Sequence, residues 1–591
     1  MTNRKLTGFL CLLVLCFAAP AGVRSQAASG PDETGLIRSS DDLDKAIAGA
    51  RHATKADPDK ASGYAFLGRL LTMKGAHLEA ERELEKALSL EPQCLYALAG
   101  LVRLYRVEHR FDLEKAELAK ALASGPNDPE VALLAATFEL DRMDFDKAAA
   151  GFQAIVDRDP RSAAGLCGLA ETAYWQNRFE DSRRFIERCL AVDSGYGRAY
   201  WLASLIHRAR QENEEWKAAG RKAVEAWPLD DEIRANLGNI LMRGEKKFEE
   251  GWEQFQIALR INPLSFTAHN YIGNGWTSKT YGPEKTEGLS ETERKVKALL
   301  TAGSAALIGR RLDEADRAFD EALELAPGTI RAVIGRGAAE YHRRRFDRSL
   351  EYFRRALELN PDYGLAHYGV AQSLLRLRDG INVKLAGLPP AHKDDGAAEP
   401  SGLRDVFTNY GELEPGLQAI IRASVKPLRS FLRTAREKGA AFYITPFHMI
   451  QSEAPGMAGI RDKRTFDGRL WDDVKGLGGI RAMSGEDWQS DVRNLRFNVV
   501  SHEFAHQVHG LVSPELRDEI KALFLKAKEQ RLTLDFYADF NEFEYFATGV
   551  EAYVSEDKLA DQKITYGHTR RELMDKDPDL YKLIERLDRQ E

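Results

Sequence analysis

Two histidines and a glutamate near the C-terminal end form the pattern with the most specific chemical meaning in this chain. The sequence His502-Glu503-Phe504-Ala505-His506 places two imidazoles four residues apart. On a helix this spacing brings both rings to one face, where they can share one zinc ion. Glu503 can take the proton of a water on that ion, so that the water attacks a peptide carbonyl. The pattern therefore predicts a zinc-dependent hydrolytic site.

A catalytic zinc ion needs a third protein ligand and one open position for water. The metzincin pattern would place glycine at position 509 and histidine at position 512, but this chain has His509 and Val512. That class is excluded. The alternative is a glutamate on a second helix, as in gluzincins, and the acidic, aromatic segment 541–547 predicts the start of such a helix.

Helix geometry limits which downstream glutamate can be that ligand. At about 100° per residue, Glu542 and Glu544 point roughly 160° apart, so only one of them can reach the zinc. Glu544 shares its face with Thr548 and Glu551. The face argument alone therefore leaves Glu544 and Glu551 as competing third ligands.

The elements that must position these residues begin with the segment 416–439, whose apolar spacing predicts a helix with a break at Pro427. An apolar, β-favouring stretch follows at 441–445, and the glycine-containing segment 471–479 precedes the histidines. Gly476 and Gly478 could let a substrate backbone pass close to an edge strand, or could simply form a turn. A helix followed by a strand predicts an α+β domain.

This order of elements, followed by Asn-Glu-x-Glu-aromatic-Phe-Ala at 541–547, is similar to the catalytic domain of anthrax lethal factor and the related Pro-Pro endopeptidases. The resemblance covers residues 441–555 and implies a zincin-type metallopeptidase fold. It implies that Glu544 is the third zinc ligand and that Tyr537 donates a hydrogen bond to the oxyanion of the transition state. Thr548 departs from the family, which usually has glutamate there, and Glu551 could replace that second carboxylate.

A fixed 34-residue step covers more than half of the chain before this domain. Prolines recur at positions 58, 92, 126, 160 and 228, with Ser194 in the remaining slot, and small residues precede most of them by five positions. The pattern resembles the tetratricopeptide repeat, in which paired helices stack into an all-α solenoid. A second block repeats it up to Pro361, after a predicted loop insertion near 270–293. The concave surface of such a solenoid usually binds a peptide or protein partner.

The predicted boundaries follow from these patterns. Residues 1–27 have the charged start, apolar stretch and small residues of a secretory signal peptide, which predicts an exported, periplasmic or secreted protein. The helical repeats occupy 40–378, the Gly- and Pro-rich segment 379–412 is a linker, and 413–591 is the zinc metallopeptidase domain. The apolar stretch is shorter than the about 20 residues that span a bilayer, and nothing else in the sequence predicts a membrane span.

Composition excludes some classes of function. The 591-residue chain has a formal net charge of −7 and shows no basic footprint, so nucleic acid is not an implied partner. After removal of the signal, Cys94, Cys167 and Cys189 remain, an odd number that predicts core thiols rather than a disulfide framework.

Two functions compete. The first is an active endopeptidase whose repeats recruit a protein substrate or partner. The second is an exported repeat scaffold with an inactive zincin domain, since His-Glu-x-x-His also arises by chance in about one or two in a hundred chains of this length. A periplasmic quality-control protease that joins the same two modules is a third possibility, but there the peptidase precedes the repeats.

Overall fold

The structure is a computed structural model, and it describes residues 37, 39–142, 144–176, 178–210, 212–283, 287–379, 398–465, 467–486, 499–535, 538–555 and 568–590. The predicted signal peptide 1–27 and Tyr537 lie outside the described residues. Within the described part of the chain, no helix is both long and apolar enough to cross a membrane.

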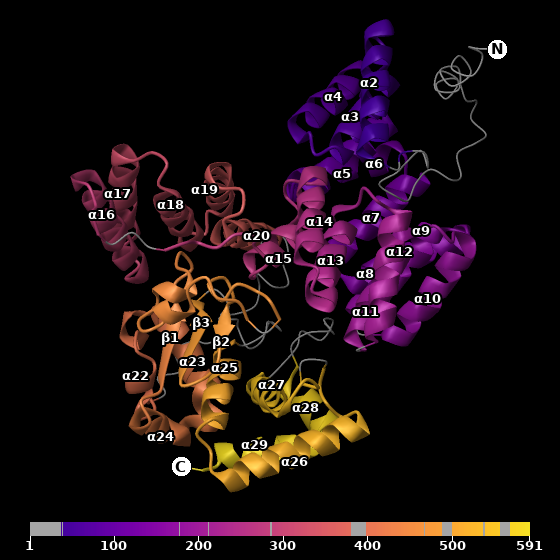
Figure 1. The fold of residues 1–591 in the computed structure, drawn as a ribbon. Coiled ribbons are helices and arrows are strands. Elements are labelled where there is room, and N and C mark those ends of the chain that lie inside the picture. The colour runs from indigo at the N-terminus through magenta and orange to yellow at the C-terminus, as the bar shows by residue number, and fades with distance from the viewer. Residues whose placement is uncertain are drawn as a thin grey trace, which may run out of the picture.

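Antiparallel helix pairs form a first block, as the 34-residue step predicts (Figure 1). The small residues that precede the proline slots are fully buried where one helix crosses the next, as at Ala87, Ala121 and Ala223. The helices of this block are α2 (Ser40–Ala56), α3 (Ala61–Met73), α4 (His77–Leu90), α5 (Leu95–Val107), α6 (Phe111–Ser124), α7 (Pro129–Asp141), α8 (Phe145–Arg158), α9 (Ala163–Trp175), α10 (Phe179–Val192), α11 (Gly197–Ala209), α12 (Asn213–Ala226), α13 (Asp231–Asn239), η2 (Ile240–Gly244), α14 (Phe248–Ile261) and α15 (Phe266–Gly273).

A second block of repeat helices follows the insertion. It consists of α16 (Glu291–Ile308), α17 (Leu312–Leu325), α18 (Ile330–His342), α19 (Phe346–Leu359) and α20 (Gly364–Asp379). The insertion is shorter than predicted, because α15 continues to Gly273 and α16 begins at Glu291. The two blocks meet where α15 packs on α20, and the Nδ1 atoms of His269 and His367 lie 2.8 Å apart there.

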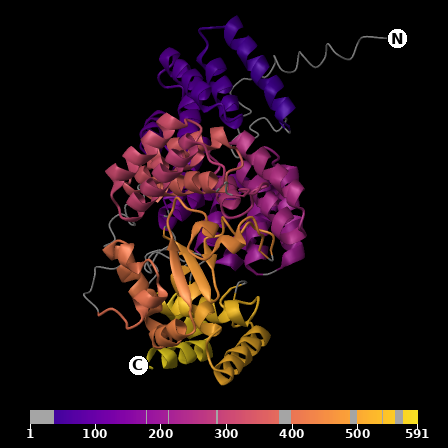
Figure 2. The ribbon, with the colours of Figure 1, turned by 60° about the vertical axis from the view of Figure 1, so that its left-hand side comes forward.

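The C-terminal domain combines helices with one small mixed sheet, which Figure 2 shows beside the repeats. Its helical elements are α22 (Leu403–Val406), η3 (Tyr410–Glu412), α23 (Pro415–Val425), η4 (Lys426–Phe431), α24 (Leu432–Glu437), η5 (Gln451–Glu453), η6 (Ala458–Ile460), α25 (Val499–His509), α26 (Pro514–Gln530), α27 (Glu542–Val554), α28 (Arg570–Lys576) and α29 (Pro578–Asp588). The predicted helix break at Pro427 is confirmed by η4, which interrupts the α-helical geometry.

Three strands form the sheet in the order β1-β3-β2. The predicted strand at 441–445 is confirmed as β1 (Ala441–Thr445), and β3 (Arg481–Gly485) pairs with it in parallel. The short strand β2 (Gly476–Leu477) pairs antiparallel with β3, with Gly476 opposite Ser484 and Leu477 opposite Met483. Among the described residues, β2 is therefore an edge of the sheet.

The core of this domain begins earlier than the predicted boundary at residue 413. Leu403, Val406, Phe407 and Tyr410 lie in the segment predicted as linker, yet they are buried in the same hydrophobic core as α25 and α27. Phe407 stacks on Phe442 of β1, with ring centroids 4.6 Å apart. Aromatic contacts of this kind are long-range, so the local Gly- and Pro-rich composition gave no sign of them.

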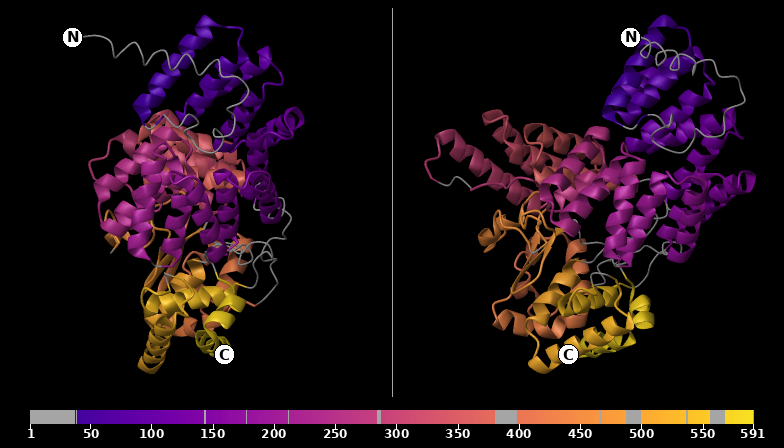
Figure 3. Two further views of the ribbon diagram at one scale, coloured as in Figure 1. Left: turned by 90° about the vertical axis from the view of Figure 1, so that its right-hand side faces the viewer. Right: turned by 45° about the vertical axis from the view of Figure 1, so that its right-hand side comes forward.

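Both repeat blocks contact the C-terminal domain, which lies below them in Figure 1 and in the right-hand view of Figure 3. Phe447 and Ile450, just after β1, are buried in the hydrophobic core of the second block. The first block meets the domain at the turn between η2 and α14, where Lys246 Nζ donates to the carbonyl oxygen of Asp467 at 3.0 Å. The repeats and the sheet are thus parts of one packed structure.

Candidate metal centre

Helix α25 carries both histidines of the predicted site. Its apolar residues Val500, Phe504 and Val508 are buried in the domain core, and this anchors the helix. His502 and His506 therefore project from one face, and their Nε2 atoms lie 3.2 Å apart. The four-residue spacing has the consequence expected on a helix.

Helix α27 brings Glu544 to the same point. Asn541 caps the helix, and its side-chain oxygen accepts from the backbone N–H of Phe543 and of Glu544, both at 2.9 Å. This cap places Glu544 in the first turn, where its Oε2 lies 3.1 Å from His502 Nε2 and 3.4 Å from His506 Nε2. The three ligand atoms lie within 4.8 Å of one another.

The convergent donors suit a zinc ion. Two imidazole nitrogens and one carboxylate oxygen are the three protein ligands that catalytic zinc takes in one common class of site, with the fourth position left to water. His502, His506 and Glu544 could hold the ion without a change of fold, because their donor atoms already face one another. No other group of three or more such residues converges in the described part of the chain.

Glu551, the competing ligand, lies on the other side of the first imidazole. Its Oε2 is 3.4 Å from His502 Nδ1, and Glu551 and His502 are both buried. A carboxylate on the second ring nitrogen fixes the tautomer and orientation of a metal-binding histidine. The geometry therefore gives the two glutamates different positions, with Glu544 beside both Nε2 atoms and Glu551 behind His502.

The carboxylates also control the charge of the site. Burial lowers the pKa of His502, but hydrogen bonds to Glu544 and Glu551 outweigh burial and raise that pKa well above its ordinary value. Burial raises the pKa of Glu544, and the hydrogen bonds to His502 and His506 reverse this effect and hold it well below its usual range. The site thus favours one or more positive charges at the point where these side chains meet.

Glu503 points toward the edge strand β2. A Cβ atom on Gly476 would clash with the Glu503 carboxylate, and one on Gly478 would lie 2.6 Å from His506 Cβ and 3.0 Å from Glu503 Oε2. Close contact with α25 therefore explains both glycines, a role that neither interpretation from the sequence included. Burial raises the pKa of Glu503, which favours its service as a proton acceptor.

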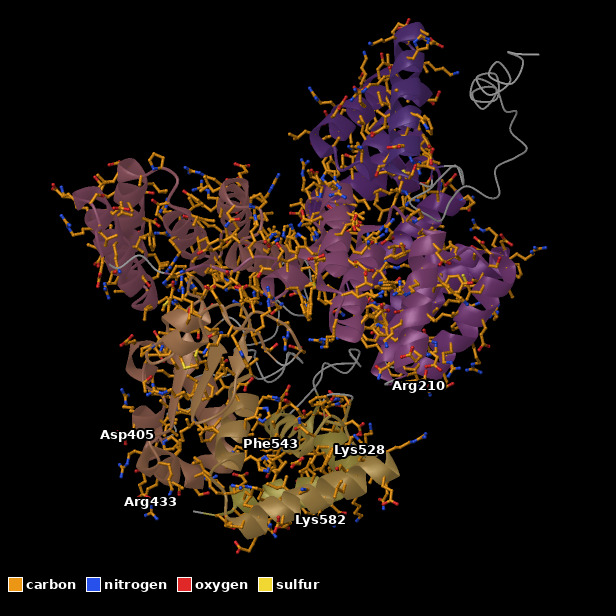
Figure 4. The ribbon with its side chains drawn as sticks, in the orientation of Figure 1. Arg210, Asp405, Arg433, Lys528, Phe543 and Lys582 are labelled. Atoms are coloured by element: carbon orange, nitrogen blue, oxygen red, sulfur yellow. The ribbon has the colours of Figure 1, made fainter. Side chains whose placement is uncertain are left out.

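Two further histidines near the sheet and α25 lie outside the centre. His509 is buried, its ring centroid lies 4.5 Å from that of Phe543, and burial lowers its pKa to about 4. Phe543 itself is 45% exposed at the start of α27, where Figure 4 labels it. His448 lies among the repeats, with its Nε2 2.6 Å from Ser304 Oγ.

Comparisons with known proteins bear on the repeats. The tetratricopeptide repeat family model matches residues 300–363 and 343–380. No curated protein matches the chain. Among solved structures, a thermophilic TPR protein of Thermus thermophilus is 21% identical over 30% of this chain and 95% of its own, with a TM-score of 0.26. The Pseudomonas aeruginosa pilF protein is 17% identical over 38% of this chain and 98% of its own, with a TM-score of 0.25.

Structural likenesses with TM-scores this low establish neither a shared overall fold nor a shared function. The family match and the helix pairs are independent of them, and they agree over the second block. Residues 300–380 therefore match tetratricopeptide repeats, and paired helices continue the same helical-repeat architecture over most of the chain, ahead of a small mixed sheet at the C-terminal end.

Proposed function

We propose that the chain is a zinc-dependent endopeptidase that hydrolyses peptide bonds in a protein or peptide substrate. The observation that carries the proposal is the meeting of three donor atoms, namely the Nε2 atoms of His502 and His506 and Oε2 of Glu544. Two helices of the C-terminal domain, α25 and α27, supply all three donors.

The roles of the side chains follow from their positions. His502, His506 and Glu544 would hold the metal, and Glu551 would orient His502 through its Nδ1. Zinc, when bound, supplies Lewis-acid activation of a water molecule and of the substrate carbonyl. Glu503 would accept the proton of the attacking water and pass it to the leaving amine. By the resemblance to lethal factor, Tyr537 would donate to the developing oxyanion.

The edge strand β2 supports a peptide as the substrate. Its pairing with β3 uses one of its two edges, and an extended peptide can add to the other by main-chain hydrogen bonds. Such a peptide would run beside Glu503, because Gly476 and Gly478 bring β2 into contact with that side chain. Main-chain recognition of this kind leaves the choice of side chains to surrounding pockets.

Export to a periplasm or to the outside of the cell is part of the proposal. It rests on the signal-like segment 1–27 of the sequence. Tetratricopeptide repeats commonly bind proteins, and the proposal keeps a protein partner or substrate for the repeats.

Zinc content and cleavage of a mixed peptide library test the proposal on the purified protein. We expect about one zinc per chain, lost in His502→Ala and Glu544→Ala. Glu551→Ala should weaken zinc binding about 10- to 100-fold, as changes behind a metal-binding histidine do. Glu503→Gln should keep the zinc and lose cleavage.

The variants also separate the proposal from the inactive scaffold. Wild-type protein without zinc and without cleavage would leave only the repeat scaffold. Zinc with no cleavage in any library would make the ion structural. If Glu551→Ala loses zinc and Glu544→Ala keeps it, the roles of the two glutamates are reversed.

A further inference from the structure

The connection between β1 and β2, residues 446–475, lies against the repeats at both of its ends. Phe447 is 3% exposed, its ring stacks on Tyr341 of α18 with centroids 4.5 Å apart, and it meets Phe353 of α19 edge-on at 5.6 Å. These contacts put a side chain of the C-terminal domain into the core of the second block.

Ion pairs surround this aromatic contact. Arg331 of α18 binds both carboxylate oxygens of Glu453. Arg310 lies 2.8 Å from Glu486, just after β3, and the Glu486 carboxylate also accepts from the backbone N–H of Phe447 at 2.7 Å. Glu486 is thus held between the second block and the start of the connection.

The insertion between the two repeat blocks holds the far end of the connection. The hydroxyl of Tyr281 accepts from the N–H of Leu365, at the start of α20, and donates to the carboxylate of Asp473. Thr277 Oγ1 lies 3.4 Å from the same carboxylate, and Leu470 N donates to the carbonyl of Gly275 at 2.8 Å. The insertion therefore fixes the residues that lead directly into β2.

The last contact lies next to β2 in sequence. The ammonium of Lys475 lies 3.8 Å from the ring centroid of Tyr368 on α20, a distance at which the ring face attracts a cation. The next residue, Gly476, begins β2 and packs on Glu503. One peptide bond thus separates a residue held by the repeats from a residue that contacts the proposed base.

The strand itself is too short to hold this position alone. It has two paired residues, one of them glycine, and glycine in a strand gives up conformational freedom without side-chain packing in return. The carbonyl of Lys475 accepts from the N–H of Gly485 at 3.0 Å, which extends the pairing by one bond. Anchors outside the sheet must supply the rest of the order.

We propose that the repeats are positioning elements of the metal centre: Tyr368 and Tyr281 hold Lys475 and Asp473, and thereby fix β2 against Glu503. The expected effect on turnover rests on the proposed function. The expected effect on the order of β2 is independent of that function. The second block and the insertion then act on the reaction itself, even for a substrate too short to reach the repeats.

The test compares Lys475→Met with Lys475→Arg and with the control Lys222→Met at an exposed lysine, all in the full-length chain. Lys475→Met removes the charge and keeps the apolar stem. Arginine also binds aromatic ring faces and should rescue the function. Lys222 makes a cation–ring contact with Tyr200 at 5.7 Å inside the first block, so its variant measures the loss of such a contact elsewhere.

Two readouts are measured on each variant. With a short peptide substrate, Lys475→Met should lower kcat at least about tenfold with zinc retained, because misplacement of a reacting group by about 1 Å can cost about 100-fold. Hydrogen exchange of the Leu477 and Gly485 amides should accelerate in Lys475→Met and in Tyr281→Phe. Lys475→Arg and Lys222→Met should behave as wild type in both readouts.

The outcomes separate the two proposals. Unchanged kcat together with unchanged exchange in Lys475→Met would overturn the positioning role while the peptidase stands. Accelerated exchange in Lys475→Met, when the wild-type protein cleaves nothing, would support the positioning of β2 and refute the peptidase. Equal acceleration in Lys222→Met would mean that the effect is general destabilisation, and would also overturn the positioning role.

Discussion

The two repeat blocks share one architecture but differ in what they contact. The second block contains Phe447 and Ile450 of the C-terminal domain within its own core. The first block instead closes on itself, because the turn at Gly75, between α3 and α4, approaches the carbonyl of Ile261 and the ring of Pro263 at the end of α14. Repeat architecture alone therefore does not indicate where a partner binds.

The two blocks also differ in the surface that they leave open to a partner. In the second block, the protein's own Phe447, Ile450 and Glu453 pack on the repeat helices, so that this part of the block is not open to a partner. In the first block, helices α3, α5 and α7 carry a charged network in which Arg69 and Arg103 both bind Glu130, at 2.5 and 3.0 Å. Arg69 is buried in this network, so the network ties the three helices together.

Truncation of one buried phenylalanine in the core of each block should give the largest difference between the two blocks. Phe447→Ala and Phe255→Ala each remove a buried ring, and each should cost about 3 to 5 kcal/mol. We expect Phe447→Ala to lower the unfolding temperature of the C-terminal domain and the second block together. Phe255→Ala should lower mainly the unfolding temperature of the first block. Hydrogen exchange resolved by segment measures both. Equal loosening of β2 in the two variants would contradict the comparison.

Removal of zinc should also affect the two repeat blocks differently. A ligand at about 100 times its Kd stabilises the folded state by about 2.7 kcal/mol, and a chelator should remove that stabilisation. We expect slower exchange with zinc in α25, α27 and β2, extending into the second block through residues 446–475. The first block should show little change. A chelator effect confined to α25 and α27 would argue against coupling between the metal centre and the repeats.

The carboxyl group of Asp473, which contacts the insertion, predicts how the stability of the protein depends on pH. Burial raises its pKa from 3.8 to about 7, with the hydrogen bond from Tyr281 and the charge of Lys475 acting against burial. A raised folded-state pKa means that the contribution to stability is complete below about pH 4 and is lost as the pH rises to about 7. The difference in pKa bounds the loss at about 4 kcal/mol.

Asp473→Asn should remove this pH dependence. Because asparagine stays neutral, we expect the variant to exceed wild type in stability by roughly 2 kcal/mol at about pH 8, and to lose that advantage near pH 4. Chemical unfolding at the two pH values measures the difference. A variant that is less stable than wild type at the higher pH would show that the folded protein favours the ionised carboxylate of Asp473.

A substitution at the contact that closes the first block should give the smallest change in the free energy of unfolding. Gly75 has a φ of +75°, and a Cβ there would lie 2.8 Å from the carbonyl oxygen of Ile261. Gly288 has a φ of +65° with no atom within 4 Å of its would-be Cβ, so Gly288→Ala measures the backbone cost alone, about 1 to 2 kcal/mol. Gly75→Ala should cost about 1 kcal/mol more. Equal unfolding free energies for the two variants would show that closure contributes nothing.

Much of the candidate metal centre was predictable because its signals are local. The spacing of His502 and His506 fixes their common face on any helix, and the apolar residues 441–445 favour a strand wherever they lie. Asn541 before two acidic residues is a typical helix start. The convergence of Glu544 with the histidines depended on the resemblance, because 38 residues separate it from His506 and helix geometry alone left Glu551 open.

The repeat period, the helices and the pair of histidines were predictable from the sequence, since each depends on residues within one or two helical turns or on a regular step. Three features could be seen only once the chain was folded. Glu551 lies behind His502, the core of the C-terminal domain starts at Leu403, and the repeats contact the residues leading into β2. Tyr281 and Asp473 are 192 residues apart. Contacts at such separation depend on how whole elements pack, and no local pattern of residues records that packing.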